Sequence, residues 1–281
     1  MSSNEEDLLA HYDREGLGKS ILEALEKAGK DLSALTLEDL APMEEFHIGG
    51  RRPTLDLGRL AGLTEGMRVV DVGCGIGGPA RALAHHFGCD VVGVDLTEAF
   101  CSAAALLNEL TGLAHKVSIR HGSALNLPLE DCSVDVAWMQ HVGMNIPDKA
   151  GLSRELVRVL RSRGRLALHE VYAGPEPAEH FPVPWASGPE LSYLVPPEEG
   201  RTLLQDAGFR VDVWQDVTRD ATTRFRGAME KTRKHGSPPI SLAILMGPKF
   251  PFMAANVLRS LEEDRLRVVQ AVLSLASPIG G

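Results

Sequence analysis

The chain has 281 residues, of which 44% are hydrophobic and 24% charged, a composition typical of a folded globular protein rather than a disordered one. The formal net charge of −9 disfavours non-specific nucleic-acid binding, because phosphates attract a basic surface. Four scattered cysteines without a CxxC pair disfavour a disulfide scaffold or a zinc site. With no apolar signal core and no run of apolar residues long enough for a membrane span, we expect a cytoplasmic protein without a membrane partner. The oligomeric state is left open, and a homodimer is one option.

The N-terminal region is predicted to be helical. Apolar residues recur at three-to-four spacing across 5–30, and Gly16 and Gly18 interrupt this pattern, which favours two short helices. A further helix is expected from Pro53. We therefore expect a helical cap over residues 1–52, followed by one larger domain over 53–281.

From residue 67 onwards, short apolar strands alternate with helices. Such alternation is typical of a parallel sheet with helices on both faces. Thr97 and Asp148 are plausible caps of two of the helices. The expected strands are 67–73, 90–96, 116–122, 133–139 and 164–173, and the expected helices are 79–88, 97–112 and 148–164.

The C-terminal part begins with a proline-rich stretch. Seven prolines in 174–200 exclude a regular strand or helix there, and the stretch follows a strand end that should border a ligand. We interpret it as a lid in which Phe181 and Trp185 cover the site, although a surface connection without a role is the alternative. The expected elements after it are a helix at 197–209, a strand at 209–218, mainly helix over 219–265, and a final edge strand at 268–276.

The strongest motif is the glycine-rich loop after the first strand, VVDVGCGIGG at residues 69–78. Its glycines would turn the chain tightly and bring backbone N–H groups to a ligand at a helix N-terminus. Gly73, Gly75 and Gly78 satisfy the dinucleotide pattern GxGxxG, and Asp95 ends the next strand, where an acid could hold ribose hydroxyls. The candidate ligands are therefore NAD(P) and S-adenosylmethionine, and a glycine turn needed only for packing is the third alternative.

The acids beside this loop favour S-adenosylmethionine. The Asp71 carboxylate would repel a pyrophosphate but could neutralise the amino group of a methionine moiety. A cationic sulfonium also suits a site with acids on both sides, and the chain offers no obvious second domain for hydride transfer.

These residues resemble the class I S-adenosylmethionine-dependent methyltransferases over about residues 65–172. The resemblance implies a Rossmann-like α/β fold with a seven-stranded, mostly parallel sheet, an antiparallel last strand, and S-adenosylmethionine as cofactor. It also implies that Ser123 replaces the acid that commonly meets the adenine amine. The residues implied to bind the cofactor are Asp71, Gly73, Gly75, Gly77, Asp95, Leu96, Ser123, Ala124 and His141.

A closer likeness covers the flanking segments Ala10–Asp13, Phe46–Arg51 and Gln140–Val142. They look like the small-molecule N-methyltransferases of phosphoethanolamine, sarcosine and dimethylglycine. In the phosphobase enzymes a tyrosine and a histidine form a lid-and-catalysis pair, and Tyr12 and His141 match those positions. Natural-product O-methyltransferases share the His-x-Gly segment. The acidic and apolar stretch after the fifth strand disfavours a phosphorylated acceptor.

His141 is the expected general base, because an imidazole at a strand end can remove a proton at neutral pH. Tyr12 is expected to close over the donor and to hydrogen-bond His141. For both, a packing role is the alternative. His169 and Glu170 could face the acceptor from the fifth strand. The candidates for lining the acceptor site are His47, Glu170, Phe181 and Trp185.

We therefore expect a methyltransferase that uses S-adenosylmethionine on a small molecule, either an amine like sarcosine or dimethylglycine or a hydroxyl. A natural-product O- or C-methyltransferase is the alternative within the class. A non-catalytic S-adenosylmethionine-binding module and an NAD-binding oxidoreductase are the alternatives outside it. No metal site is expected, since His85 and His86 have no ligand partner at suitable spacing.

Overall fold

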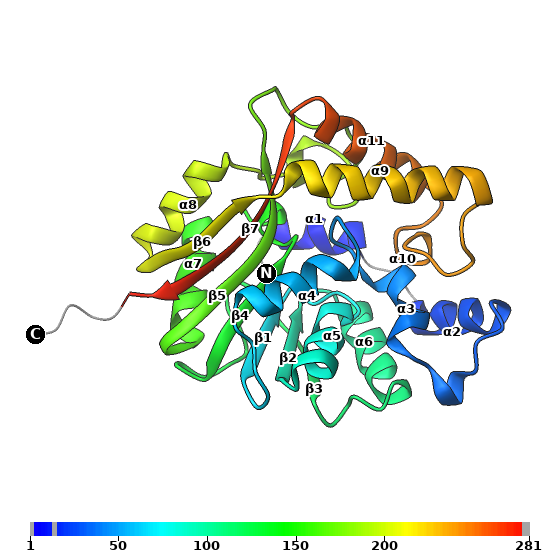
Figure 1. The fold of residues 1–281 in the computed structure, drawn as a ribbon, viewed down its shortest axis with the longest axis horizontal. Coiled ribbons are helices and arrows are strands. Elements are labelled where there is room, and N and C mark those ends of the chain that lie inside the picture. The colour runs from blue at the N-terminus through cyan, green and yellow to red at the C-terminus, as the bar shows by residue number, and fades with distance from the viewer. Residues whose placement is uncertain (1–2, 13–15, 277–281) are drawn as a thin grey trace, which may run out of the picture.

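The computed structural model describes residues 3–12 and 16–276, and its centre is a seven-stranded sheet (Figure 1). The strand order is β3-β2-β1-β4-β5-β7-β6, and β7 alone runs antiparallel to both of its neighbours. This confirms the predicted Rossmann-like α/β fold with an antiparallel last strand. The strands are β1 Arg68–Val72, β2 Asp90–Asp95, β3 Val117–His121, β4 Val134–Gln140, β5 Leu160–Ala173, β6 Phe209–Asp216 and β7 Leu266–Leu275.

Helices cover both faces of the sheet, as predicted. Val69 of β1 packs in the cluster that contains residues of α4 and α5, whereas its neighbour Val70 packs in the cluster that contains residues of α7 and α8. Successive residues of a strand point to opposite faces, so a strand that is apolar at every position needs cover on both sides. The helices of the sheet region are α4 Arg51–Leu60, α5 Gly78–Phe87, α6 Glu98–Leu110, α7 Lys149–Val159 and α8 Pro197–Asp206.

The N-terminal region forms α1 Ser3–Tyr12 and α2 Leu17–Lys27, in agreement with the two short helices expected there. It also forms α3 Leu37–Glu44, where a loop around Pro42 was expected, because Thr36 and Asp39 cap the start of this helix. The apolar side chains of α2 are buried against α6 and α10. Glu44 of α3 makes a fully buried ion pair with Arg81 of α5, at 2.6 Å between Oε2 and Nη2. Packing of α2 and charge pairing of α3 thus tie these two helices to the sheet region.

One predicted helix boundary and one predicted strand position are wrong. The helix that starts after Asp148 ends at Val159 instead of Gly164, because N–H groups of the two residues before β4 take the carbonyls of its last turn (Cys132 to Arg158, 2.8 Å). The Asp148 cap itself is confirmed, since its carboxylate accepts from the Gly151 N–H at 2.7 Å. The final strand, β7, is not an edge strand, because β6 lies outside it.

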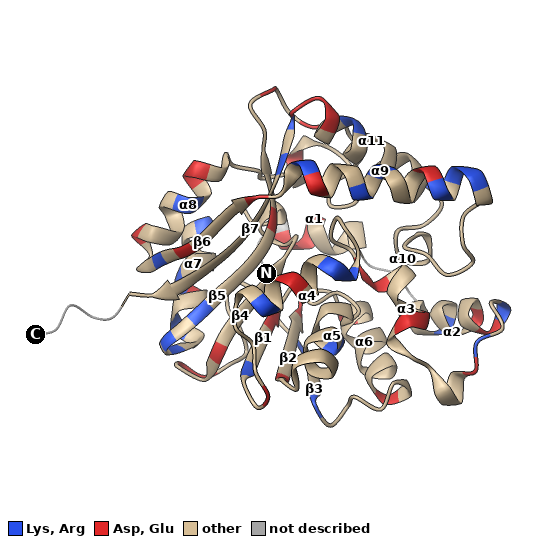
Figure 2. Cartoon of the chain, viewed as in Figure 1, with Lys and Arg blue, Asp and Glu red and all other residues tan. Residues whose placement is uncertain are grey.

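The proline-rich segment 174–200 has no strand, and regular helix returns only with α8. Beyond the sheet, α9 Thr218–His235, α10 Ala243–Met246 and α11 Phe250–Glu262 lie together on one side of the molecule (Figure 1). The basic last turn of α9 is exposed (Figure 2). Within the described part of the chain, no helix has the length and apolarity that crossing a bilayer requires.

Candidate active site

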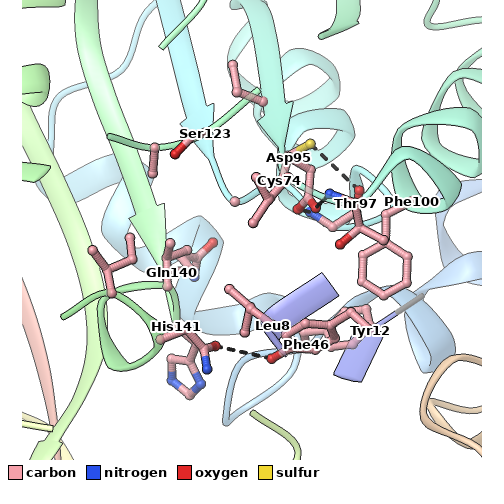
Figure 3. A pocket seen from close by; sticks show the side chains of 18 of the residues that line it. Leu8, Tyr12, Phe46, Cys74, Asp95, Thr97, Phe100, Ser123, Gln140 and His141 are labelled. Carbon is pink, nitrogen blue, oxygen red and sulfur yellow. Dashed lines mark hydrogen bonds between the residues drawn. The ribbon is translucent and has the colours of Figure 1, made fainter. Parts of the chain in front are cut away.

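A cavity opens where the carboxyl ends of β1, β2, β3 and β4 meet, and α1 crosses its mouth (Figure 3). We call it the edge cavity. The space between its lining residues, open mouth included, is about 1110 Å³. The predicted site residues that line it are Tyr12, His47, Gly73, Gly75, Asp95, Leu96, Ser123, Ala124 and His141.

The loop after β1 is shaped by close contacts that only glycine permits. Gly73 has φ +68°, and a Cβ atom there would lie 2.5 Å from Cγ2 of Val142. Its N–H donates to the Val94 carbonyl at 2.7 Å, which fixes the turn. Gly77 has φ +82° but is not among the cavity-lining residues, and a Cβ atom there would lie 2.9 Å from Nη1 of Arg81. Gly73 and Gly75 therefore border the ligand space, whereas Gly77 serves the packing of α5.

Asp95 presents a carboxylate that backbone donors hold in place. Its Oδ2 accepts from the Gly75 N–H at 2.8 Å, and its Oδ1 accepts from the Thr97 N–H at 2.9 Å. Burial raises the pKa of this carboxyl. Each oxygen keeps a further lone pair, so the carboxylate can still accept hydrogen bonds from ligand hydroxyls.

Asp71 is buried behind the loop and does not line the edge cavity. Among the described residues, its Oδ2 has no hydrogen-bond partner. Burial, followed by the charge of Asp95, raises the pKa of Asp71 to about 8. The expected contact with a methionine amine stays a prediction.

Ser123 and Ala124 line the far end of the cavity, and α1 brings an acid to them. The Ser123 hydroxyl donates to Oε1 of Glu5 at 2.7 Å. Glu5 was not a predicted site residue, because nothing in the sequence indicates which strand end α1 will cover. The resemblance implied an acid at position 123, where this chain has Ser123. Glu5, which is distant in the sequence, brings a carboxylate to this position.

Gln140 is a second residue that the predictions missed. Its Oε1 accepts from Nε1 of Trp138 at 2.8 Å and from the Thr54 hydroxyl at 3.2 Å, which fixes the orientation of the amide. Its buried Nε2 has no partner, and the residue lines the edge cavity. An unsatisfied amide donor beside a glycine loop suits a ligand carboxylate. The signal in the sequence that could have indicated Gln140 is its position at the end of a predicted strand, where side chains border the ligand edge of the sheet.

A second cavity, the side chamber, adjoins the first. It shares Tyr12, Phe46, His47 and His141 with the edge cavity, and its volume, mouth included, is about 1670 Å³. Most of its wall is apolar, and it comes mainly from α9, α10, α11 and residues 41–50. Among the predicted lining residues, Trp185 is 3% exposed and borders the chamber, whereas Phe181 does not line it.

His141 stands at the junction of the two cavities. Its backbone has φ +54°, and its ring stacks on that of His169 with 5.4 Å between centroids. Its buried Nε2 has no hydrogen-bond partner in the part of the chain that the structure describes. Burial, together with His169 and His47, lowers the pKa of His141 well below its usual value, so the ring is neutral at physiological pH. No metal site is found in the described residues, because they contain no group of three side chains that could hold a metal ion.

Tyr12 does not contact His141 as expected. Its hydroxyl donates to Oδ1 of Asn145 at 3.3 Å, and its ring packs edge-on against Phe100 (Figure 3). Burial raises the pKa of this phenol. The prediction of a Tyr12–His141 hydrogen bond is therefore wrong, because α1 crosses the cavity nearer to the turn at Gly143–Asn145.

Glu170 does not face the side chamber, which corrects another expectation. Its carboxylate accepts from the N–H groups of Val142 and Gly143 at 2.9 and 3.0 Å, so it holds the loop that carries His141. Burial raises the pKa of Glu170 to about 7. His169, on the opposite face of β5, packs toward His47 and His141, with Nε2 hydrogen-bonded to the Ile48 carbonyl at 3.2 Å.

The family profile described as "Methyltransferase domain" matches residues 70–168. The chain is 29% identical to sarcosine/dimethylglycine N-methyltransferase of Halorhodospira halochloris, over 60% of this chain and 61% of that protein. It is 30% identical to O-methyltransferase resE of Aspergillus sclerotiorum, over 64% of this chain and 69% of that protein. Among solved structures, the [4+2]-cyclase SpnF has the same fold, with a TM-score of 0.70, 21% identity, and coverage of 99% and 98% of the two chains.

The chain spans between a third and about three fifths of the length of three curated relatives that it matches. The profile match covers β1 to β5, which carry the glycine loop, Asp95, Gln140 and His141. Together with the match over two thirds of an O-methyltransferase, this shows that the chain belongs to the class I S-adenosylmethionine-dependent methyltransferases.

Proposed function

We propose that the protein transfers a methyl group from S-adenosylmethionine to an apolar small molecule bound in the side chamber. One observation carries this proposal: the edge cavity and the side chamber meet at Tyr12, Phe46, His47 and His141. Two ligands that occupy adjoining cavities are held in line, and such alignment with exclusion of water supplies much of the acceleration of a displacement.

The edge cavity fits the cofactor because its polar side chains can each make a further hydrogen bond. Asp95 would accept from the ribose hydroxyls, Gln140 Nε2 would donate to the carboxylate, and Glu5 with Ser123 would meet the adenine. When bound, the cofactor supplies an electrophilic methyl group on a sulfonium. Leu96 and Ala124 would pack along it.

The side chamber favours a natural-product-like acceptor over a small amine of the sarcosine type. Its walls are mostly Ala, Ile, Leu, Met, Phe, Pro and Val, and its volume exceeds what a compact zwitterion fills. Transfer of a charged amine into such a space would cost free energy without compensating partners. A hydroxyl on an apolar molecule is the better match, and His141 Nε2 is available to accept its proton. The cytoplasmic location and the oligomeric state stay predictions.

Calorimetry with S-adenosylhomocysteine and NAD tests the cofactor half of the proposal, and we expect binding of the former only. A panel of apolar alcohols and phenols, and separately sarcosine and dimethylglycine, is then incubated with donor carrying a labelled methyl group. Label in an apolar hydroxyl compound supports the proposal. Label only in the amines would overturn the acceptor class. Donor binding without any transfer across the panel would favour the non-catalytic module.

A further inference from the structure

The wall of the side chamber includes a residue with a buried, unpartnered polar atom that the methyl transfer does not use. Among the described residues, six side chains have a buried polar atom without a hydrogen-bond partner, and only two of them, Glu45 and His141, line the chamber. His141 also borders the edge cavity, whereas Glu45 borders the chamber alone. The partner of Glu45 would therefore lie away from the reacting group.

The environment of Glu45 leaves its Oε2 unoccupied. The side chain follows α3 and is 6% exposed, and its Oε1 accepts from Nε of Arg51 at 3.1 Å. Nε2 of His47 is 3.5 Å from Oε2 but donates to the Gly50 carbonyl at 2.9 Å. A buried carboxyl oxygen without a partner costs free energy that a ligand can recover.

The charges around Glu45 are already balanced. Glu44 pairs with both Arg51 (3.0 Å) and Arg81 (2.6 Å), so two buried carboxyls face two guanidinium groups. The site therefore does not need a cation to neutralise it. Burial, reinforced by the charge of Glu44, raises the pKa of Glu45 to about 8, so both protonation states are accessible near neutral pH. A hydroxyl suits both states, because it can donate to the carboxylate or accept from the acid.

We propose that Glu45 is a specificity-determining residue whose Oε2 hydrogen-bonds a second hydroxyl of the acceptor, remote from the one that is methylated. This inference rests on the proposed function. The substrate class is thus an apolar molecule with at least two hydroxyl groups, one at His141 and one at Glu45. The other polar groups of the chamber wall are less available; Arg224, for example, pairs with Asp220 at 2.6 Å.

The test is a double-mutant cycle in which one change removes a hydroxyl from the ligand and the other removes the carboxyl group of Glu45. Octanediol, decanediol and dodecanediol with terminal hydroxyls, each beside the matching monoalcohol, are titrated into the protein saturated with S-adenosylhomocysteine. These flexible chains let the second hydroxyl find its partner at whichever length fits. We expect the preference of wild type for the best diol over its monoalcohol to fall about tenfold in Glu45→Met, which keeps the side-chain length but has no such acceptor.

Glu38→Met is the matched control. Glu38 is 75% exposed and pairs with the same Arg51 at 3.3 Å, but it does not line the chamber. We expect it to keep the wild-type preference. An unchanged diol preference in Glu45→Met, with S-adenosylhomocysteine affinity intact, would overturn the role of Glu45. Failure of wild type to bind the cofactor product or any monoalcohol would instead count against the proposed function.

A measurement on wild type covers the case in which Glu45→Met does not fold. The infrared difference spectrum on adding the diol should show a shifted buried carboxyl band that the monoalcohol does not produce. Identical difference spectra for the two ligands would overturn the proposal.

Discussion

At the scale of single residues, His141 combines a strained backbone, an unpartnered Nε2 and a strongly lowered pKa. If it accepts the acceptor's proton, His141→Ala should lower kcat roughly 10²–10⁴-fold with little change in S-adenosylhomocysteine affinity. The lowered pKa keeps the imidazole neutral as the pH falls through 6.5. The rate of wild type should therefore stay level there and decrease only at lower pH. A pH–rate profile of both proteins with a turnover-competent acceptor measures this, and equal rates in the two would reduce His141 to a structural residue.

Asp95 is the residue expected to hold the cofactor ribose. Asp95→Ala should weaken S-adenosylhomocysteine binding by about 1–3 kcal/mol, since charge-assisted hydrogen bonds are lost. Asp90→Ala is the control, because Asp90 lies at the other end of β2, where it pairs with Lys116 on the surface. Titration calorimetry compares the two variants. Equal affinities in Asp95→Ala and wild type would move the ribose contact elsewhere.

At the scale of elements, α1 closes the edge cavity through a few polar contacts. These are Glu5 with Ser123, Tyr12 with Asn145, and His11 with the Pro184 carbonyl at 3.0 Å. A protein lacking residues 1–12 should keep its sheet, as seen by circular dichroism, because little of the core belongs to α1. Its affinity for S-adenosylhomocysteine should fall by roughly tenfold or more, the scale of one lost charge-assisted hydrogen bond. Unchanged affinity would show that α1 does not contribute to the binding site.

The end of α7 and the position of β7 were set by contacts between distant parts of the chain, which a local sequence pattern does not reveal. The apolar periodicity of residues 148–164 continues past Val159, yet the approach to β4 takes the last helical carbonyls and β5 begins at Leu160. Likewise, the apolar run of β7 indicated a buried strand, but its place between β5 and β6 follows from the path of the whole chain.

At the scale of the whole molecule, the Arg81–Glu44 pair joins the N-terminal helices to the sheet region. Arg81 is fully buried and also donates to Oδ1 of Asn108 at 2.9 Å. Arg81→Met should lower the free energy of unfolding by about 1–3 kcal/mol, because Oε2 of the buried Glu44 carboxylate loses its partner and only the pair of Oε1 with Arg51 remains. Arg59→Met, which removes an exposed partner of Asp56, should change it by about 0.5 kcal/mol or less. Urea unfolding followed by fluorescence and circular dichroism compares them. Coincident transitions by both probes are expected, whereas two separate ones would show that residues 1–52 unfold alone.

The sequence by itself determined the class of fold and the place of the glycine loop at the carboxyl edge of the sheet. Alternating apolar strands and helices specify a covered parallel sheet, and glycines after a buried strand, with an acid ending the next, specify a ligand at its carboxyl edge. These are local patterns, because spacing along a strand or loop fixes which way Gly73, Gly75 and Asp95 face. The same logic placed His141 at that edge.

Only the tertiary structure decided which distant residues complete the site. Glu5 reaches Ser123 and Tyr12 reaches Asn145 across more than a hundred residues of chain, and Glu170 turns to hold a loop instead of facing a ligand. Glu45 became a candidate only because the structure places it in the chamber wall with one carboxyl oxygen bonded to Arg51 and the other without a hydrogen-bond partner among the described residues. Whether a buried polar group is satisfied depends on partners that packing brings together, and sequence spacing carries no information about them.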